Sequence, residues 1–178
     1  LIVTGSALSL GKRLKFPDDF FTLFHTLRYQ HYVLNNYNSR AFVFNDGIAN
    51  NLSYGLTFGR NSVDQPIYPR SGANLSLSIQ VTPPYSLFDN RDFSTLTDQE
   101  KFKWVEFHKW KFDASWYTKI VGNFVLVTRA KYGFLGYYNS GVGLSPFERF
   151  ELGGDGLSGF YLDGRDIVKL RGYDPGDF

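Results

Sequence analysis

Apolar and polar residues alternate along most of this chain. Six runs show the pattern, at residues 1–14, 21–30, 52–59, 74–85, 105–121 and 124–134, the first of them only weakly. In the fourth run, Leu75, Leu77 and Ile79 occupy one face, whereas Ser76 and Ser78 occupy the other. A period of two indicates β-strands with one apolar and one polar face. The chain is therefore predicted to be all-β, with about six antiparallel strands.

The length of the runs favours strands that cross a membrane. The longest have about 12 to 17 residues, whereas strands of soluble domains centre on about 5 to 6 and a tilted transmembrane strand needs about 9 to 11. The polar face also carries Lys109, Lys111 and Asp113 in mid-strand, as the wet interior of a barrel accepts. Long hairpins of a soluble β-sandwich remain the alternative at this point.

The connections between the runs alternate in length. Residues 16–19, 64–72 and 122–123 make short connections, whereas 36–50, 88–102 and everything after 139 make long ones. Outer-membrane barrels have short periplasmic turns and long extracellular loops. We therefore expect residues 1–139 to be six meandering transmembrane strands, and residues 140–178 to be a long extracellular loop.

Six strands do not close a transmembrane barrel, for which about eight is the smallest number in a single chain. An open edge in lipid leaves unpaired backbone groups, each costing several kcal/mol. The chain also starts at Leu1 and contains no Met. We therefore expect it to be a segment of a larger barrel, with more strands outside it.

Composition narrows the class of protein further. The 178 residues fit one domain, and the absence of Cys excludes a disulfide framework. A net charge of +2 is too small to argue for nucleic acid. Aromatic residues make up 19% of the chain, yet the mean hydropathy is −0.26, and no run approaches the roughly 20 apolar residues of a transmembrane helix. These features exclude a helical membrane protein and leave a β-barrel open.

Several motifs resemble catalytic or metal sites, but their contexts argue against those functions. Residues 154–159 match the dinucleotide pattern G-x-G-x-x-G without the strand and helix that it requires. The carboxylate pairs Asp18–Asp19 and Asp163–Asp166 lie in a turn and in a Gly-rich loop. The three histidines, His25, His31 and His108, have no carboxylate at metal-ligand spacing. We therefore expect no enzyme activity, no metal and no cofactor.

Three segments, in order along the chain, resemble those of BamA-type outer-membrane barrels. The turn at 64–72, with Pro69 and Gly72, resembles a periplasmic turn of that family. Residues 147–154, which end at Gly153 and Gly154, resemble the segment that opens its sixth extracellular loop. The stretch Leu170, Arg171, Gly172 and Tyr173 resembles the Val/Ile-Arg-Gly-Phe/Tyr motif of that loop. Nearly the whole chain is covered, as the middle six strands of the barrel.

The resemblance implies a fold, a location and a function. The fold is an antiparallel transmembrane barrel of about 16 strands in the outer membrane of a diderm bacterium. The function is to fold and insert β-barrel proteins without covalent chemistry, by pairing client strands with exposed strand edges in a deformed bilayer. Implied partners are the outer-membrane lipid bilayer, nascent β-barrel clients and accessory assembly lipoproteins. The alternatives are a passive channel or transporter barrel, and a related two-partner secretion translocator.

The resemblance also assigns roles within the long loop. It implies that the loop folds into the barrel lumen, where Arg171 contacts an acidic site on strands beyond Phe178. Gly172 then permits a tight backbone and Tyr173 packs inside. A guanidinium in such a partly dehydrated place needs a carboxylate or several carbonyl groups. Two departures stand out: Leu170 replaces a β-branched residue, and the stretch 155–169 lengthens the loop.

Overall fold

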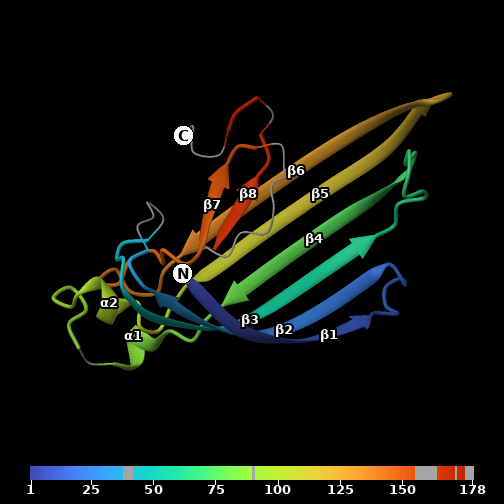
Figure 1. Cartoon of the computed structure of the whole chain (residues 1–178). Coiled ribbons are helices and arrows are strands. Elements are labelled where there is room, and N and C mark those ends of the chain that lie inside the picture. Colours follow the sequence, from blue (N-terminus) through green and yellow to red (C-terminus); the bar gives the residue numbers. More distant parts are fainter. Residues whose placement is uncertain (38–41, 90, 155–163, 171, 175–178) are drawn as a thin grey trace.

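In the computed structural model, six antiparallel strands form one sheet in sequential order. The structure describes residues 1–37, 42–89, 91–154, 164–170 and 172–174. The strands are β1 (Ile2–Arg13), β2 (Phe21–Leu34), β3 (Gly47–Asn61), β4 (Gly72–Val81), β5 (His108–Val121) and β6 (Phe124–Gly136) (Figure 1). The all-β prediction of about six long antiparallel strands is confirmed.

The two ends of the sheet differ, as the connection lengths predicted. At one end, which we call the turn end, residues 14–20, 62–71 and 122–123 join neighbouring strands. At the other, the loop end, residues 35–46, 82–107 and the stretch after 136 make long excursions (Figure 1). The loop end carries two short helices that sequence periodicity did not reveal, α1 (Tyr85–Phe88) and α2 (Asp98–Lys101). No helix in the described part of the chain has the length and apolar character to cross a membrane.

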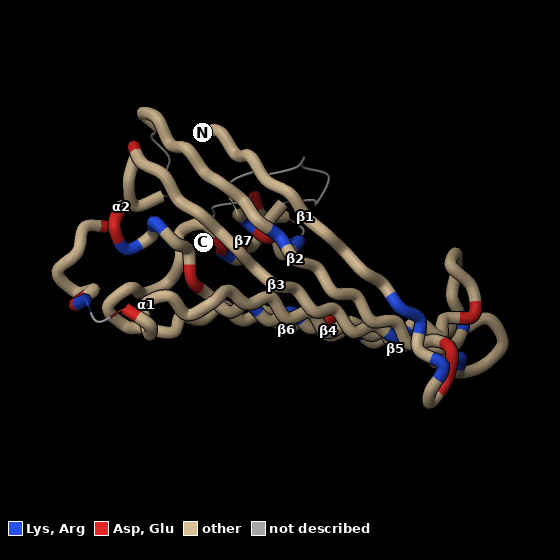
Figure 2. Tube along the Cα trace, turned by 90° about the horizontal axis from the view of Figure 1, so that it is seen from below, with Lys and Arg blue, Asp and Glu red and all other residues tan. Residues whose placement is uncertain are grey.

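The loop after β6 forms a small ribbon of two parallel strands, β7 (Arg149–Leu152) and β8 (Arg165–Val168), which the sequence did not predict. The six-stranded sheet curves around the ribbon: β7 lies between the arm formed by β1–β3 and the arm formed by β4–β6 (Figure 2). We call the face of the sheet toward the ribbon the inner face and the opposite face the outer face.

Strand pairing assigns each residue to one of these faces, because residues directly opposite each other point to the same side. The pairs Gly55–Gln80, Gln80–Lys109 and Ser78–Lys111 put the polar positions together on the inner face. The outer face carries exposed apolar and aromatic side chains along the length of the strands: Leu8, Leu10, Leu27, Phe58, Leu77, Trp110, Phe112, Trp116 and Phe134. The two faces predicted from the alternation are therefore present.

The buried core lies at the loop end rather than within the sheet. It combines the ends of the strands with the long connections, through Tyr32, Leu34, Phe42, Phe44, Ala49, Phe93, Phe102, Val105, Phe107, Val142 and Phe147. Phe147 is fully buried, with its ring centroid 4.8 Å from that of Tyr32 and 4.9 Å from that of Phe42. Because Phe147 lies two residues before the start of β7, this packing fixes the point from which the ribbon starts.

Several strand boundaries differ from the predictions. Strand β2 continues to Leu34 beyond the run 21–30, and β3 covers Gly47–Asn61 rather than 52–59, so the predicted connection 36–50 shortens to 35–46. The run 74–85 continues the alternation to Tyr85, but β4 ends at Val81, because Pro83 and Pro84 cannot donate to a strand ladder. The run 105–121 starts early, whereas β5 starts at His108. Val105 and Phe107 are instead fully buried in the core. Between them, the buried Glu106 carboxylate accepts hydrogen bonds from the backbone N–H and the hydroxyl of Ser86, at 2.9 and 2.6 Å.

Candidate functional site

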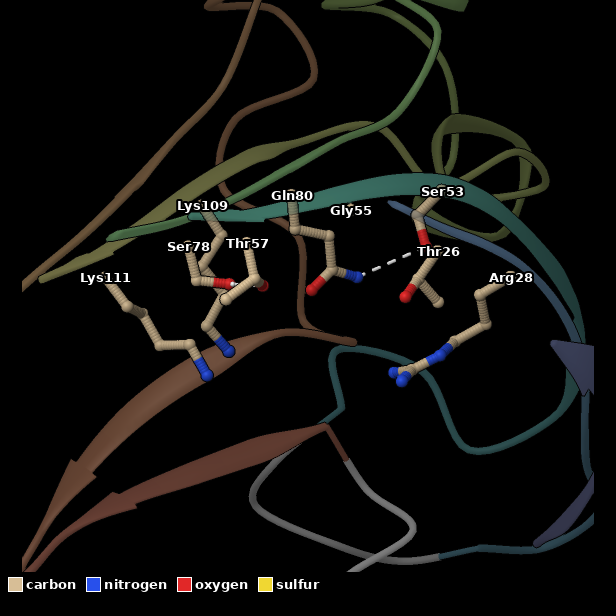
Figure 3. Close-up of a pocket in the computed structure, with 9 residues that line it drawn as sticks. All are labelled: Thr26, Arg28, Ser53, Gly55, Thr57, Ser78, Gln80, Lys109 and Lys111. Carbon is tan, nitrogen blue, oxygen red and sulfur yellow. Dashed lines mark hydrogen bonds between the residues drawn. The ribbon is translucent and has the colours of Figure 1, made fainter. Parts of the chain in front are cut away.

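A polar pocket opens on the inner face where β2, β3, β4 and β5 lie side by side (Figure 3). Its volume is about 190 Å³, and it is lined by Thr26, Arg28, Ser53, Gly55, Thr57, Ser78, Gln80, Lys109 and Lys111. The Gln80 amide donates to the Ser53 hydroxyl at 3.2 Å. The hydroxyls of Thr57 and Ser78 are hydrogen-bonded at 2.9 Å. The lining therefore supplies three cations and several hydroxyl groups but no carboxylate.

The β7–β8 ribbon brings carboxylates to this basic pocket. Glu148, just before β7, forms an ion pair with Lys109 at 2.9 Å between Oε2 and Nζ. Asp166, in β8, places Oδ2 2.9 Å from Nζ of Lys111 and 3.3 Å from Nζ of Lys109. These contacts join residues up to 57 positions apart, 166 minus 109, and hold the loop against the inner face.

Burial distinguishes the two lysines. The Lys109 side chain is 5% exposed and Glu148 is 9% exposed, so their ion pair is almost fully removed from water. Lys111 is 47% exposed and Asp166 is 31% exposed. Burial raises the pKa of Asp166, but the hydrogen bond from Lys111 and the charges of both lysines outweigh it and leave that pKa below its ordinary value of 3.8. Asp166 therefore remains a carboxylate at neutral pH.

Shape complementarity accompanies the charges. Phe150 of β7 lies over Gly133 of β6, and a Cβ atom on that glycine would be 2.8 Å from Cζ of the ring. Nζ of Lys109 lies 4.9 Å from the centroid of the same ring, a cation–π distance. The absence of a side chain at Gly133 therefore lets the ribbon approach the sheet closely.

The predicted loop-entry and motif residues lie next to each other at the end of the ribbon. The backbone N–H of Gly153 donates to the carbonyl of Val168 at 3.1 Å, and that of Gly154 to the carbonyl of Tyr173 at 2.7 Å. Gly153, Gly154 and Gly172 have positive φ angles of 120°, 79° and 87°, which glycine adopts without strain. The structure therefore brings the loop-entry glycines to Tyr173 of the motif.

The motif itself is described only in part. Leu170 is 37% exposed and Tyr173 is 49% exposed. Arg171 lies outside the described residues, as do residues 155–159 of the G-x-G-x-x-G match and Asp163. The roles assigned to Leu170, Arg171, Gly172 and Tyr173 stay predictions.

The predicted periplasmic turn lies at the turn end, between β3 and β4. Oδ1 of Asp64 accepts hydrogen bonds from the backbone N–H groups of Gln65, Arg70 and Ser71, at 3.0, 3.0 and 3.2 Å. These hydrogen bonds hold the pKa of Asp64 below its ordinary value, and the bond from the Arg70 backbone has the largest effect. Gly72 has a φ of 100°, and a Cβ there would collide with the carbonyl of Ser62. Pro69 lies within the turn, between the donors Gln65 and Arg70.

The three histidines lie on the outer face, each beside a polar neighbour. Nδ1 of His25 is 2.6 Å from the Tyr54 hydroxyl, and Nδ1 of His31 is 2.8 Å from Oδ1 of Asn50. Nδ1 of His108 accepts a hydrogen bond from the Trp110 indole at 3.1 Å. Within the described ranges, no group of His, Asp and Glu side chains has the arrangement of a metal site.

Sequence reasoning missed the residues that dock the ribbon. The alternation predicts that Lys109 and Lys111 lie on the polar face, but it does not pair them with Glu148 or Asp166. Nothing in the sequence pattern singles out Gly133. The available signal was a surplus of mid-strand lysines on one face, with acids in the loop that follows.

Comparison with known proteins identifies one family. The Omp85 superfamily domain matches residues 4–177. No curated protein matches the chain. The family match includes the sheet from Thr4 of β1 onward, together with the ribbon that lies against it.

Proposed function

The chain belongs to the Omp85 superfamily, and from this membership we propose that it is the middle of the barrel of a BamA-like insertase. Proteins of this superfamily act in outer membranes, in the insertion or translocation of proteins. The membership identifies the six-stranded sheet as part of a larger transmembrane barrel. The proposed substrates are nascent β-barrel proteins of the outer membrane of a diderm bacterium.

The distribution of side chains on the sheet supports the proposal. The outer face presents aromatic and aliphatic groups, such as Trp110, Phe112 and Leu77, as a lipid-facing wall requires. The inner face carries the pocket with Arg28 and Lys109, as a lumen does. In this arrangement the turn end faces the periplasm and the loop end faces the exterior.

The mechanism we propose involves no covalent step. A client strand gains backbone hydrogen bonds by pairing with an exposed strand edge, while local thinning of the bilayer lowers the barrier to insertion. This chain would supply the wall opposite that edge, the lining of the lumen and the inward-folded loop. No residue is assigned a catalytic role, and accessory assembly lipoproteins are proposed partners.

The observation that carries the proposal is the family match, together with the loop that returns to the inner face. In the proposed role, Arg171 reaches an acidic site on the barrel wall, and the ribbon brings it there. A translocator of the same superfamily is the second candidate, because the motif at Leu170–Tyr173 is common to both.

Reconstitution of the full-length protein in lipid vesicles tests the proposal. An unfolded β-barrel client should fold several-fold faster in these vesicles than in empty ones, measured by its heat-modifiable mobility in gels. Arg171→Ala should reduce this acceleration without abolishing insertion of the protein itself.

A client rate equal to that in empty vesicles would contradict the insertase function. In that case, passage of a secreted polypeptide into the vesicle interior would favour the translocator. A normal client rate with Arg171→Ala would contradict only the role assigned to the arginine.

A further inference from the structure

We propose that Lys109 is a positioning residue that holds the β7–β8 ribbon in the lumen, as an anchor separate from the Arg-Gly-Tyr motif. The proposal rests on the proposed function only in treating the inner face as the lumen of an insertase. Its evidence is a set of contacts among described residues at the loop end of β5.

The ammonium group of Lys109 joins the sheet to both strands of the ribbon. Its partner Glu148 immediately precedes β7, and its second partner Asp166 lies within β8. Between these two carboxylates, the Phe150 ring covers the same ammonium group at 4.9 Å. Lys109 is therefore the residue at which sheet, β7 and β8 meet.

Burial makes this anchor dependent on all of its partners. Burying a charged group costs free energy unless the group is paired and hydrogen-bonded. Removing one partner of a buried ion pair is therefore strongly destabilising, because it leaves the other charge buried and unpaired. In the docked state only 5% of the Lys109 side chain is exposed, so water cannot readily replace a partner that is removed by substitution. Lys111 shares Asp166 but is 47% exposed, and ion pairs in that setting contribute little.

The position of the ribbon determines where the motif begins. Leu170 follows the end of β8 by two residues, and the hydrogen bond between Gly154 and Tyr173 ties the far side of the motif to the loop entry. Any displacement of β7 and β8 therefore displaces Leu170 and Tyr173 with them. Lys109 would set the starting point from which Arg171 reaches its own partner.

The full-length protein with a single reporter cysteine tests the anchor. This segment contains no native Cys, so Val168→Cys provides one thiol of its own in β8. The rate at which a bulky maleimide modifies this thiol reports how often the ribbon leaves the inner face. Lys109→Met should raise the rate at least tenfold, while the heat-modifiable mobility of the barrel stays normal.

A double-mutant cycle distinguishes a specific anchor from general loosening. Glu148→Gln should also raise the rate of modification. The increase in the double variant with Lys109→Met should be well below the product of the two single increases, because both substitutions remove the same interaction. Lys131→Met is the matched control. Its ion pair with Asp113 joins neighbouring strands of the sheet and is 65% and 47% exposed, so the rate should not change.

An unchanged rate in Lys109→Met, or a fully multiplicative cycle, would overturn the proposal. Equal effects of Lys109→Met and Lys131→Met would do the same. The rate of maleimide modification does not depend on whether the protein inserts clients. A mobile ribbon with normal client folding would refute the proposed function of the loop and leave the anchor standing.

Discussion

Gly133 is a residue where the absence of a side chain lets the ribbon approach the inner face. A Cβ at this position would lie 2.8 Å from the Phe150 ring, closer than real Cβ atoms approach their neighbours. Gly133→Ala should therefore push the ribbon away from β6, at a cost of about 1–3 kcal/mol, as overpacking does elsewhere. A nitroxide on Val168→Cys should become more mobile in its electron paramagnetic resonance spectrum.

Two further variants make that experiment decisive. Gly55→Ala is the control on the same face, because its Cβ would meet Thr26 at 3.6 Å, an ordinary contact. Phe150→Leu in combination with Gly133→Ala should restore part of the ordered spectrum, because the shorter side chain relieves the collision. Equal mobility in the Gly133→Ala and Gly55→Ala proteins would contradict the assigned fit.

Individual residues also show which features of the site can be predicted from the sequence. Alternation alone places Lys109 and Lys111 on the polar face, because each strand residue has only two directions to choose from. Nothing local indicates that Glu148 meets Lys109, since that contact depends on how a loop of irregular conformation folds back. The side of the sheet was predictable from the residues, whereas the partner was not.

At the scale of elements, the long strands and the short ribbon obey different rules. Runs such as 124–134 repeat the period many times, so their type is plain from the sequence and only their ends shift. Strands β7 and β8 have four residues each, too few for a period, and contacts of Phe147 and Lys109 with distant residues lie beside them. Tertiary contacts determine such elements, and local sequence does not.

The ion pairs of the ribbon predict how its docking depends on pH. The pKa of Asp166 is below 3.8 in the folded chain, so the carboxylate contributes fully above about pH 4 and loses its contribution as pH falls through the lowered value. The nitroxide on Val168→Cys should keep one spectrum from pH 8 to about pH 4.5 and become mobile only in stronger acid.

Asp166→Asn is the control for this titration. The amide keeps the shape but not the charge, so the ribbon should already be more mobile at neutral pH and the acid transition should shrink. A transition centred above pH 5 in the unmodified sequence would show that a group other than Asp166 controls docking. The ion pairs of Asp166 would then not be what holds the ribbon at this site.

At the scale of the whole molecule, the unusual feature is where the apolar surface lies. A soluble sandwich buries its apolar face, yet here Trp116 is 58% exposed and Leu77 is 37% exposed on the outer face. The buried core is instead gathered at the loop end. A bilayer against the outer face supplies the apolar surroundings that the chain itself does not provide.

The same charge should therefore cost much more stability on the outer face than on the inner face. Leu77 lies near the middle of β4 on the outer face, opposite Phe58 and Phe112. Leu77→Arg should destabilise the membrane-inserted protein by about 2–4 kcal/mol, the cost of an arginine on the lipid side near the midplane. Urea titration of the full-length protein folded in vesicles measures the change.

Ser76→Arg is the matched control, one residue away and on the inner face. Ser76 lies opposite Asp113, whose ion pair with Lys131 is largely exposed. The new guanidinium can share this carboxylate or stay hydrated in the wet interior, so the loss of stability should be small. Equal losses at the two positions would mean that both faces meet the same surroundings, as in a soluble sheet. A larger loss at Ser76 than at Leu77 would reverse the assignment of the faces, and the proposed lumen with it.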